Sequence, residues 1–108
     1  TIKEEAELVQ VGDIRIDPSQ YEVIVSDEKV DVTPKEFELL MYMIKRINRI
    51  LSREQLLDAI WNFDYAGETR IVDVHISHLR EKIEVDTKNP TYIRTVRGFG
   101  YKFEDPKK

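Results

Sequence analysis

The segment 69–103, TRIVDVHISHLREKIEVDTKNPTYIRTVRGFGYKF, decides the fold of this chain, because it joins a helical repeat to a glycine-tipped hairpin. In its first half, apolar residues recur at steps of four, three and four, at Val72, Ile76, Leu79 and Ile83. At about 100° per residue these side chains share one narrow stripe of an α-helix. The spacing therefore predicts a long helix, beginning near Thr69, whose stripe faces a hydrophobic core.

The opposite face of this helix mixes a cation, a methyl surface and hydrogen-bonding groups. Its members are Arg70, Val74, Ser77, His78 and Glu81. Such a mixture suits the edges of DNA bases, but an ordinary amphipathic helix is also polar on its wet side. The helix alone does not separate these two interpretations.

The second half of the segment predicts a β-hairpin, with β-branched and aromatic runs at 92–97 and 101–103 around Gly98-Phe99-Gly100. The two glycines supply the positive φ that a tight turn needs. A Gly-x-Gly also occurs in phosphate-binding loops, but the third glycine and the following helix are missing here. We therefore interpret the hairpin as a projecting ribbon with Arg97 at its tip, of a width that lets the guanidinium enter a narrow minor groove.

Composition narrows the class of protein. With 108 residues and 41% hydrophobic content, the chain is expected to fold as one domain with its own core. It has no cysteine, which excludes disulfides and thiolate metal sites and makes the reducing cytoplasm a natural location. No apolar run approaches about 18 residues and no signal-peptide pattern opens the sequence, so membrane insertion and secretion are unsupported.

The net charge of −4 argues against a polyanionic partner unless the charges are segregated. Residues 1–68 hold 8 Lys or Arg against 15 Asp or Glu, whereas residues 69–102 hold 7 against 4. The predicted helix and hairpin therefore form a basic side on an acidic body. Salt screens exposed charges beyond a Debye length of roughly 10 Å, so the acidic body repels DNA only weakly at the basic side. Such a basic side is therefore able to bind DNA.

The sequence before the helix divides into short elements. We expect a linker remnant at 1–7, a domain at 8–104 and a tail at 105–108. Four alternating runs separated by turn residues predict an antiparallel meander, and these runs are 8–11, 14–16, 21–25 and 29–32.

Two capping patterns start the next two helices. Thr33-Pro34-Lys35-Glu36 places a hydroxyl at the N-cap, proline at the first helical position and glutamate three residues after the cap. This helix is expected to run through Ile47. After an extended link at 50–51, Ser52-Arg53-Glu54-Gln55 repeats the pattern and starts a shorter helix that ends near Trp61.

The order of these elements predicts an α+β fold. It is a winged helix-turn-helix with an N-terminal four-stranded antiparallel sheet, three helices and a C-terminal β-hairpin wing. In this plan the second and third helices form the helix-turn-helix, and the third helix lies in the major groove of DNA.

Several segments, in this order, resemble the C-terminal DNA-binding output domain of OmpR/PhoB-type bacterial response regulators. The similarity runs roughly from Val9 to Phe103, and the segments that carry it are TPKEFELL (33–40), LSREQLL (51–57), IW (60–61), RIVDVHI (70–76), LREKI (79–83) and TVRGFGY (95–101). In this family a phosphoacceptor receiver domain normally precedes the output domain, and nothing in this sequence resembles one. The resemblance thus implies a receiver domain and, indirectly, a sensor histidine kinase as partners.

The resemblance also implies roles for side chains of the long helix. Positions that touch phosphates correspond to Arg70, His75 and Arg80. Positions near base edges correspond to Asp73, Val74 and His78, with Ser77 on the same surface. There Val74 is expected to contact a thymine methyl, and Asp73 to accept from a cytosine amino group.

Outside the helix, the resemblance implies three further DNA contacts and a second partner. Trp61 matches a position whose indole N–H meets the backbone, although its ring would also suit the core. Thr95 matches a backbone contact, and Arg97 matches the wing arginine that enters the minor groove. The segment that contacts RNA polymerase corresponds to Asn62, Phe63, Asp64, Tyr65, Ala66, Gly67 and Glu68. Head-to-tail occupancy of direct-repeat half-sites in double-stranded DNA is also implied.

The sequence departs from several relatives at Ser77 and His78, where they carry arginines. Bidentate arginine-to-guanine readout is then missing at these two positions. We therefore expect A·T-rich bases and DNA shape to carry more of the specificity.

Two other classes of function stand beside DNA binding: an enzyme with a metal site, and a protein-interaction module. His75 and His78 lie within reach of one metal ion, but a third ligand is missing because Asp73 points away on the helical wheel. We therefore expect no metal, no cofactor and no catalysis. A winged-helix protein-interaction module without DNA binding is the alternative, supported by the net charge of −4.

Overall fold

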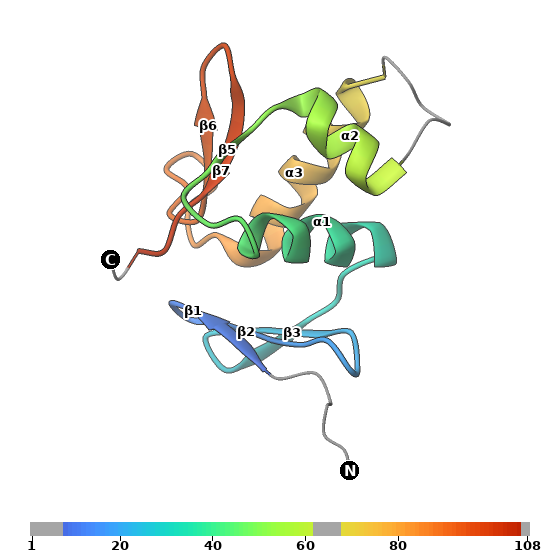
Figure 1. The fold of residues 1–108 in the computed structure, drawn as a ribbon. Coiled ribbons are helices and arrows are strands. Elements are labelled where there is room, and N and C mark those ends of the chain that lie inside the picture. Colours follow the sequence, from blue (N-terminus) through green and yellow to red (C-terminus); the bar gives the residue numbers. More distant parts are fainter. Residues whose placement is uncertain (1–7, 62–67, 107–108) are drawn as a thin grey trace.

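The computed structural model describes residues 8–61 and 68–106, which form two antiparallel sheets and three helices (Figure 1). The N-terminal sheet has the order β1 (Val9–Val11), β2 (Ile14–Asp17), β3 (Glu22–Val25) and β4 (Glu28–Val30). One side of α1 (Pro34–Ile44) lies over this sheet, and beyond α1 lie α2 (Arg53–Trp61) and α3 (Arg70–Ile83). The C-terminal sheet has the order β5 (Ile50–Leu51), β7 (Gly100–Phe103) and β6 (Ile93–Val96).

Alternation along the N-terminal sheet buries one of its faces. Ile14 and Ile16 are fully buried, whereas Arg15 between them is exposed. Gly12, in the turn between β1 and β2, has a φ of 56°, and a side chain there would collide with the hydroxyl of Tyr92. The Tyr92 hydroxyl accepts a hydrogen bond from the N–H of Asp13 at 2.9 Å. This bond connects the N-terminal sheet to the segment before β6. The predicted four-stranded meander is confirmed.

Helix α1 begins with the predicted capping box. The Glu36 N–H donates to Thr33 Oγ1 at 3.2 Å, and the Thr33 N–H donates to Glu36 Oε1 at 3.0 Å. The predicted continuation through Ile47 is wrong, since the helix ends at Ile44. Asn48 adopts a φ of 67°, which reverses the chain and directs it into β5.

The second capping pattern is half formed. Ser52 Oγ accepts the N–H of Gln55 at 3.0 Å, as expected. The side-chain amide of Gln55 donates instead to the hydroxyl of Tyr42 at 3.2 Å, so it joins α2 to α1.

The extended link at 50–51 is a strand, because β5 pairs antiparallel with β7. Gly100 makes this close approach possible, since a Cβ there would overlap the carbonyl oxygen of Leu51. The predicted hairpin of β6 and β7 is therefore braced on one edge by the residues that lead into α2. We call this hairpin, residues 93–103, the wing.

The stripe predicted on α3 is confirmed, since its four apolar side chains are at most 1% exposed: Val72, Ile76, Leu79 and Ile83. They share one hydrophobic core with the inner faces of α1, α2 and both sheets. The α+β winged-helix architecture expected from the sequence is thus confirmed. No helix in the described part of the chain is long and apolar enough to cross a membrane.

The domain boundaries stay a prediction. The first strand begins at Val9 and the last ends at Phe103, inside the expected domain of 8–104. The predicted linker at 1–7 and residues 107–108 of the predicted tail lie outside the described residues.

Candidate nucleic-acid interface

Helix α3 turns one face away from the core, and this face carries the side chains expected to read bases. Val74 is 44% exposed, which is unusual for a valine in a helix that buries its other apolar stripe. Ser77 and His78 are also exposed, one turn further along. The structure thus brings together a methyl surface, a hydroxyl and an imidazole on one solvent-facing strip.

Two exposed arginines lie outside this strip, one on α3 and one on the wing. Arg70 is exposed in the first turn of α3, and Arg97 is exposed at the tip of the wing. Within residues 8–61 and 68–106, neither guanidinium forms an ion pair. Both cations are therefore available to an anionic ligand.

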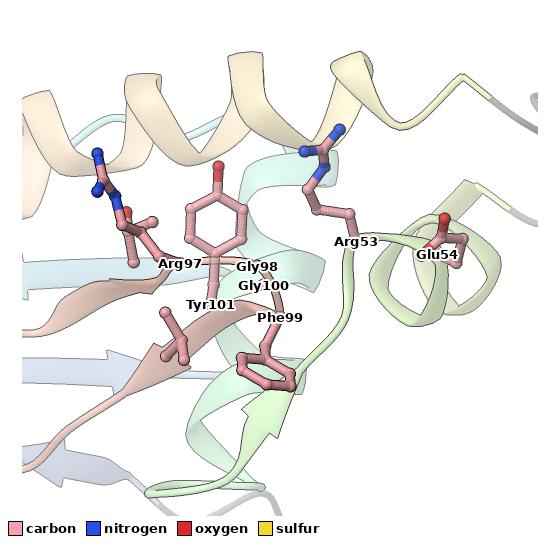
Figure 2. Close-up of a pocket in the computed structure, with 9 residues that line it drawn as sticks. Arg53, Glu54, Arg97, Gly98, Phe99, Gly100 and Tyr101 are labelled. Atoms are coloured by element: carbon pink, nitrogen blue, oxygen red, sulfur yellow. The ribbon is translucent and has the colours of Figure 1, made fainter.

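A hollow of about 420 Å³ separates the wing from the start of α2, lined by Arg53, Glu54 and residues 95–101. Figure 2 shows Arg53, Arg97 and Tyr101 extending toward α3, whereas Phe99 points the other way. Arg53 was not singled out from the sequence. It comes from α2, and only the folded chain places its charge beside the wing.

Asp73 is held by the wing. The Tyr101 hydroxyl donates to Asp73 Oδ1 at 2.6 Å, and the Arg53 guanidinium lies 3.7 Å from the same oxygen. Burial, and then the hydrogen bond to this carboxylate, raise the pKa of Tyr101 to about 12. The acidic side chain in the first turn of α3 is thus already engaged within the protein, and its contact with a base stays a prediction.

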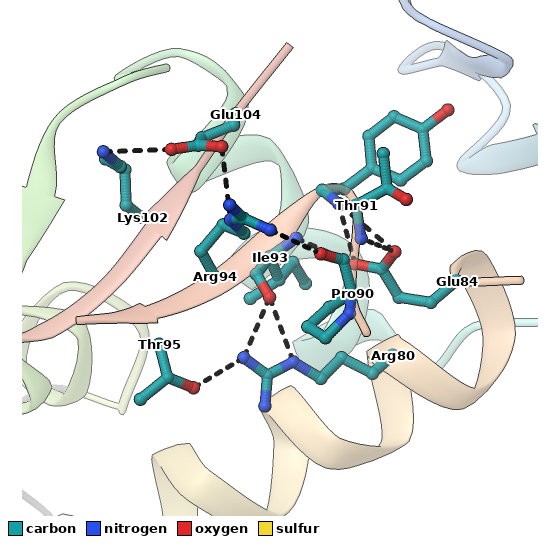
Figure 3. A network of polar contacts seen from close by, with 10 residues as sticks. Arg80, Glu84, Pro90, Thr91, Ile93, Arg94, Thr95, Lys102 and Glu104 are labelled. Atoms are coloured by element: carbon teal, nitrogen blue, oxygen red, sulfur yellow. Dashed lines mark hydrogen bonds and ion pairs between the residues drawn. The ribbon is translucent and has the colours of Figure 1, made fainter. Parts of the chain in front are cut away.

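Arg80 and Thr95, both expected to touch phosphates or backbone, are in direct contact. Arg80 donates from Nε and Nη2 to the carbonyl oxygen of Ile93 at 3.1 and 2.8 Å, and from Nη2 to Thr95 Oγ1 at 2.7 Å (Figure 3). Its guanidinium carbon also lies 5.6 Å from the ring centre of Tyr101. Arg80 therefore joins α3 to β6 before it meets any ligand.

Glu84 anchors the start of the wing, which the sequence analysis missed. Its carboxylate is 8% exposed and accepts the N–H groups of three successive residues, at 2.6 to 3.2 Å, from Thr91, Tyr92 and Ile93 (Figure 3). An acidic residue directly after a helix is unfavourable for the helix dipole. That placement was the available signal that Glu84 serves another purpose.

A charge chain runs along the base of the wing. Glu104 lies 3.3 Å from Arg94 and 3.0 Å from Lys102 (Figure 3). These two cations are therefore partly neutralised, and the exposed charge of the wing is concentrated at Arg97.

Trp61 and His75 pack against each other, with ring centres 4.8 Å apart in an edge-to-face arrangement. Trp61 is 6% exposed and belongs to the core. His75 is half-buried, and its Nδ1 lies 3.0 Å from the carbonyl oxygen of Ile71, one turn earlier. The tryptophan and the backbone together fix the orientation of this imidazole.

His78 approaches a buried carboxylate of α1. Its Nδ1 lies 3.6 Å from Glu36, which is 3% exposed and also forms a 2.6 Å ion pair with Lys82. Burial opposes the charged form of Glu36, but the hydrogen bonds from Lys82 and Thr33 and the nearby charges lower its pKa. Glu36 thus places a fixed negative charge behind the exposed ring of His78.

The remaining two features considered from the sequence are a metal site and the segment expected to contact RNA polymerase. In the described part of the chain, no three His, Asp or Glu side chains are grouped as ligands of a metal ion, and Asp73 faces the wing. Residues 62–67 of the segment expected to contact RNA polymerase lie outside the described residues, and Glu68 is exposed.

The sequence is similar to known regulators over most of its length. A family model described as "Transcriptional regulatory protein, C terminal" matches residues 27–103. The alkaline phosphatase synthesis transcriptional regulatory protein PhoP of Bacillus subtilis is 56% identical over 99 residues, which cover 92% of this chain and 41% of PhoP. The sensory transduction protein RegX3 of Mycolicibacterium smegmatis is 43% identical over 97 residues, which cover 90% of this chain and 42% of RegX3. The chain thus spans about two fifths of the length of these relatives.

Solved structures share the fold. The RstA DNA-binding domain of Klebsiella pneumoniae, in complex with the RstA box, has a TM-score of 0.84 at 32% identity, covering 93% of this chain and 99% of that one. The Thermotoga maritima response regulator DrrB, an OmpR/PhoB homolog, has a TM-score of 0.84 at 33% identity, and the match covers 94% of this chain and 46% of DrrB. The chain therefore belongs to the OmpR/PhoB response regulators, as a C-terminal DNA-binding output domain of a transcriptional regulator.

Proposed function

We propose that this domain binds specific sequences of double-stranded DNA, with α3 in the major groove and the wing in the minor groove. The observation that carries the proposal is the exposed surface of α3, together with two exposed arginines that have no ion-pair partner in the described part of the chain, Arg70 and Arg97. A helix in the major groove reads base edges through such a face, and an arginine on a ribbon suits a narrow minor groove.

Within this arrangement the side chains take different parts. Val74, Ser77 and His78 meet base edges, whereas Arg70 and His75 meet phosphates. Arg80 uses Nε and Nη2 within the protein, which leaves its Nη1 group to donate to a phosphate beside Thr95.

Asp73 and Trp61 complete the proposed interface. Asp73 accepts a hydrogen bond from a cytosine amino group, either in addition to the hydroxyl of Tyr101 or in its place. Its contribution therefore depends on the position of the wing. Trp61 is mostly buried, and it contributes only through its indole N–H to the DNA backbone.

The proposal extends to partners of the longer regulator. It includes two domains head to tail on direct-repeat half-sites, because one small module buries too little surface for useful specificity. It also includes contact of residues 62–68 with RNA polymerase, a receiver domain and a sensor histidine kinase, all on the basis of family resemblance. Because bacterial chromosomal DNA is cytoplasmic, the same location follows for the protein.

Salt dependence tests the proposal against a module that binds only proteins. Fluorescence anisotropy with duplexes selected from random DNA would give the affinity as the salt concentration is varied. For about four to five neutralised phosphates, the slope of log affinity against log salt is expected between about −3 and −5. A flat slope, or no binding at low salt, would favour the protein-interaction module.

A further inference from the structure

The backbone of α3 decides which nitrogen of His75 carries a proton. Nδ1 lies 3.0 Å from the carbonyl oxygen of Ile71. A carbonyl oxygen only accepts hydrogen bonds, so Nδ1 must donate and carries the proton. In the neutral ring Nε2 then has a lone pair and no hydrogen, whereas in the imidazolium both nitrogens donate. Nε2 therefore donates to a ligand only when a second proton has been added.

The surroundings hold this ring and leave a positive charge on it unpaired. Trp61 of α2 packs its ring edge-to-face at 4.8 Å, and His78 lies 6.1 Å away on α3. The carboxylate of Asp73, two residues earlier on α3, is engaged by Tyr101 of the wing and Arg53 of α2. Among the described residues, no carboxylate forms an ion pair with His75.

His78 differs in this respect. The carboxylate of Glu36, on α1, lies 3.6 Å from its Nδ1 and supplies a negative charge before any DNA is bound. Lys82 shares that carboxylate at 2.6 Å. A proton on His78 is therefore partly compensated within the domain, whereas a proton on His75 has no carboxylate partner among the described residues.

We propose that this domain takes up a proton at His75 when it binds DNA. The inference rests on the proposed function, in which His75 meets a phosphate. Against the neutral ring, the lone pair of Nε2 faces an anionic oxygen and repels it. Against the imidazolium, Nε2–H donates a charge-assisted hydrogen bond to the same oxygen. The phosphate is thus the counter-charge that the DNA-free domain lacks.

Proton uptake makes DNA affinity depend on pH with a defined sign. When the complex holds one proton more than the separate partners, affinity falls as the pH rises. For one proton the fall approaches roughly tenfold per pH unit wherever the complex holds the proton and the DNA-free domain does not.

Titration calorimetry in buffers of different ionisation enthalpy counts the protons. With a duplex selected from random DNA, we expect an uptake of about one proton per domain for the native chain. His75→Gln is expected to bind with no uptake, because its side-chain amide donates without being protonated. His78→Gln, which removes the other imidazole, is expected to keep the uptake even where its affinity for the duplex changes.

Nitrogen NMR of the imidazole gives a second readout that needs no variant. The two states are compared at one pH, chosen so that in the DNA-free chain only Nδ1 of His75 carries hydrogen. In the complex at that pH, both ring nitrogens of His75 should carry hydrogen. Native chain that binds DNA without proton uptake, or His75→Gln that retains the uptake, would overturn the inference. Failure of the native chain to bind DNA at low salt would instead contradict the proposed function.

Discussion

The hydroxyl of Tyr101 donates to the carboxylate of Asp73 at 2.6 Å, and this bond connects strand β7 of the wing to the first turn of α3. The two residues are 28 positions apart in sequence. Arg80 makes a second connection, from the last turn of α3 to β6. Two polar contacts thus fix the orientation of the wing relative to α3.

Tyr101→Phe is expected to lower the free energy of unfolding by about 1–2 kcal/mol, because it removes a part-buried hydrogen bond to a charged group. It should also loosen the wing, and DNA affinity should fall further than stability alone explains. Urea unfolding and anisotropy measure the two effects. Tyr21→Phe, at a tyrosine that is 62% exposed, is the control and should change neither.

The same tyrosine makes stability depend on alkaline pH. Its pKa is raised to about 12 in the folded chain, first by burial and then by Asp73, above the value of about 10 expected when unfolded. The folded state therefore favours the neutral phenol, and this stabilisation is present below about pH 10 and lost as the pH rises toward about 12. Its size is on the order of 2–3 kcal/mol.

Tyr101→Phe provides the reference for that pH dependence, since lysines also titrate in this range. Urea unfolding at several pH values should show the difference in stability between native and variant shrinking above about pH 10. A constant difference across the range would contradict the assignment of the raised pKa to Tyr101.

Glu84→Gln is expected to destabilise the domain by about 2–3 kcal/mol. The amide has one acceptor oxygen in place of two, and its NH₂ group would face an N–H that the carboxylate now accepts. Amide exchange should accelerate at Tyr92 and Ile93, whose N–H groups lose their partner. Glu81→Gln, on the exposed face of the same helix, removes an equal charge and should leave stability nearly unchanged.

Arg97→Ala is expected to cost about 1–3 kcal/mol in DNA binding with little effect on folding, because the side chain is exposed. It should also reduce the salt slope by about one unit if the guanidinium neutralises one phosphate. Arg15→Ala removes the same charge from β2 of the N-terminal sheet and should barely change binding. Loss of folding in Arg97→Ala would show that the wing arginine is structural.

Local patterns predicted the fold because the forces behind them act between neighbours in sequence. The stripe on α3 and the capping box at Thr33 and Glu36 depend on residues three or four positions apart, and both are confirmed. The end of α1 was misjudged, since Ile47 continues the apolar period although the chain turns at Asn48. The chain turns there because β5 pairs with β7. That pairing joins segments far apart in sequence, so no local pattern predicts it.

The candidate site was predictable as a surface but not as a set of contacts. Exposure of Val74 and Arg97 followed from helical and hairpin periods. The bonds from Tyr101 to Asp73 and from Arg80 to β6 join residues 13 to 28 positions apart, so they leave no spacing to read. The same holds for the placement of Arg53 beside the wing.

The two glycines of the wing are expected to respond differently to substitution. Gly100→Ala places a Cβ onto the carbonyl oxygen of Leu51, so it should force β5 away from β7 and destabilise the domain strongly. Gly98→Ala meets no atom within 4 Å, and its cost should be confined to the strained φ of 79°, about 1–2 kcal/mol. Thermal unfolding of the two variants, side by side, would test this order.

His78→Arg is expected to change the DNA sequence that the domain selects. An arginine there regains bidentate donation to the O6 and N7 atoms of guanine, which the imidazole does not supply. Glu36 lies behind this position, but Lys82 already pairs with it at 2.6 Å, so the new guanidinium should remain directed at the groove. Its longer side chain also reaches further from α3 than the imidazole does.

Selection from random DNA with the native chain and with His78→Arg is the test. The variant should gain guanine at one position of the site, whereas the native chain should prefer A·T-rich sequence there. Gln20→Arg is the control, because it adds the same charge at an exposed position outside α3 and the wing. Identical selected sites for native and variant would mean that His78 does not face a base, and base reading would then fall to Val74 and the shape of the groove.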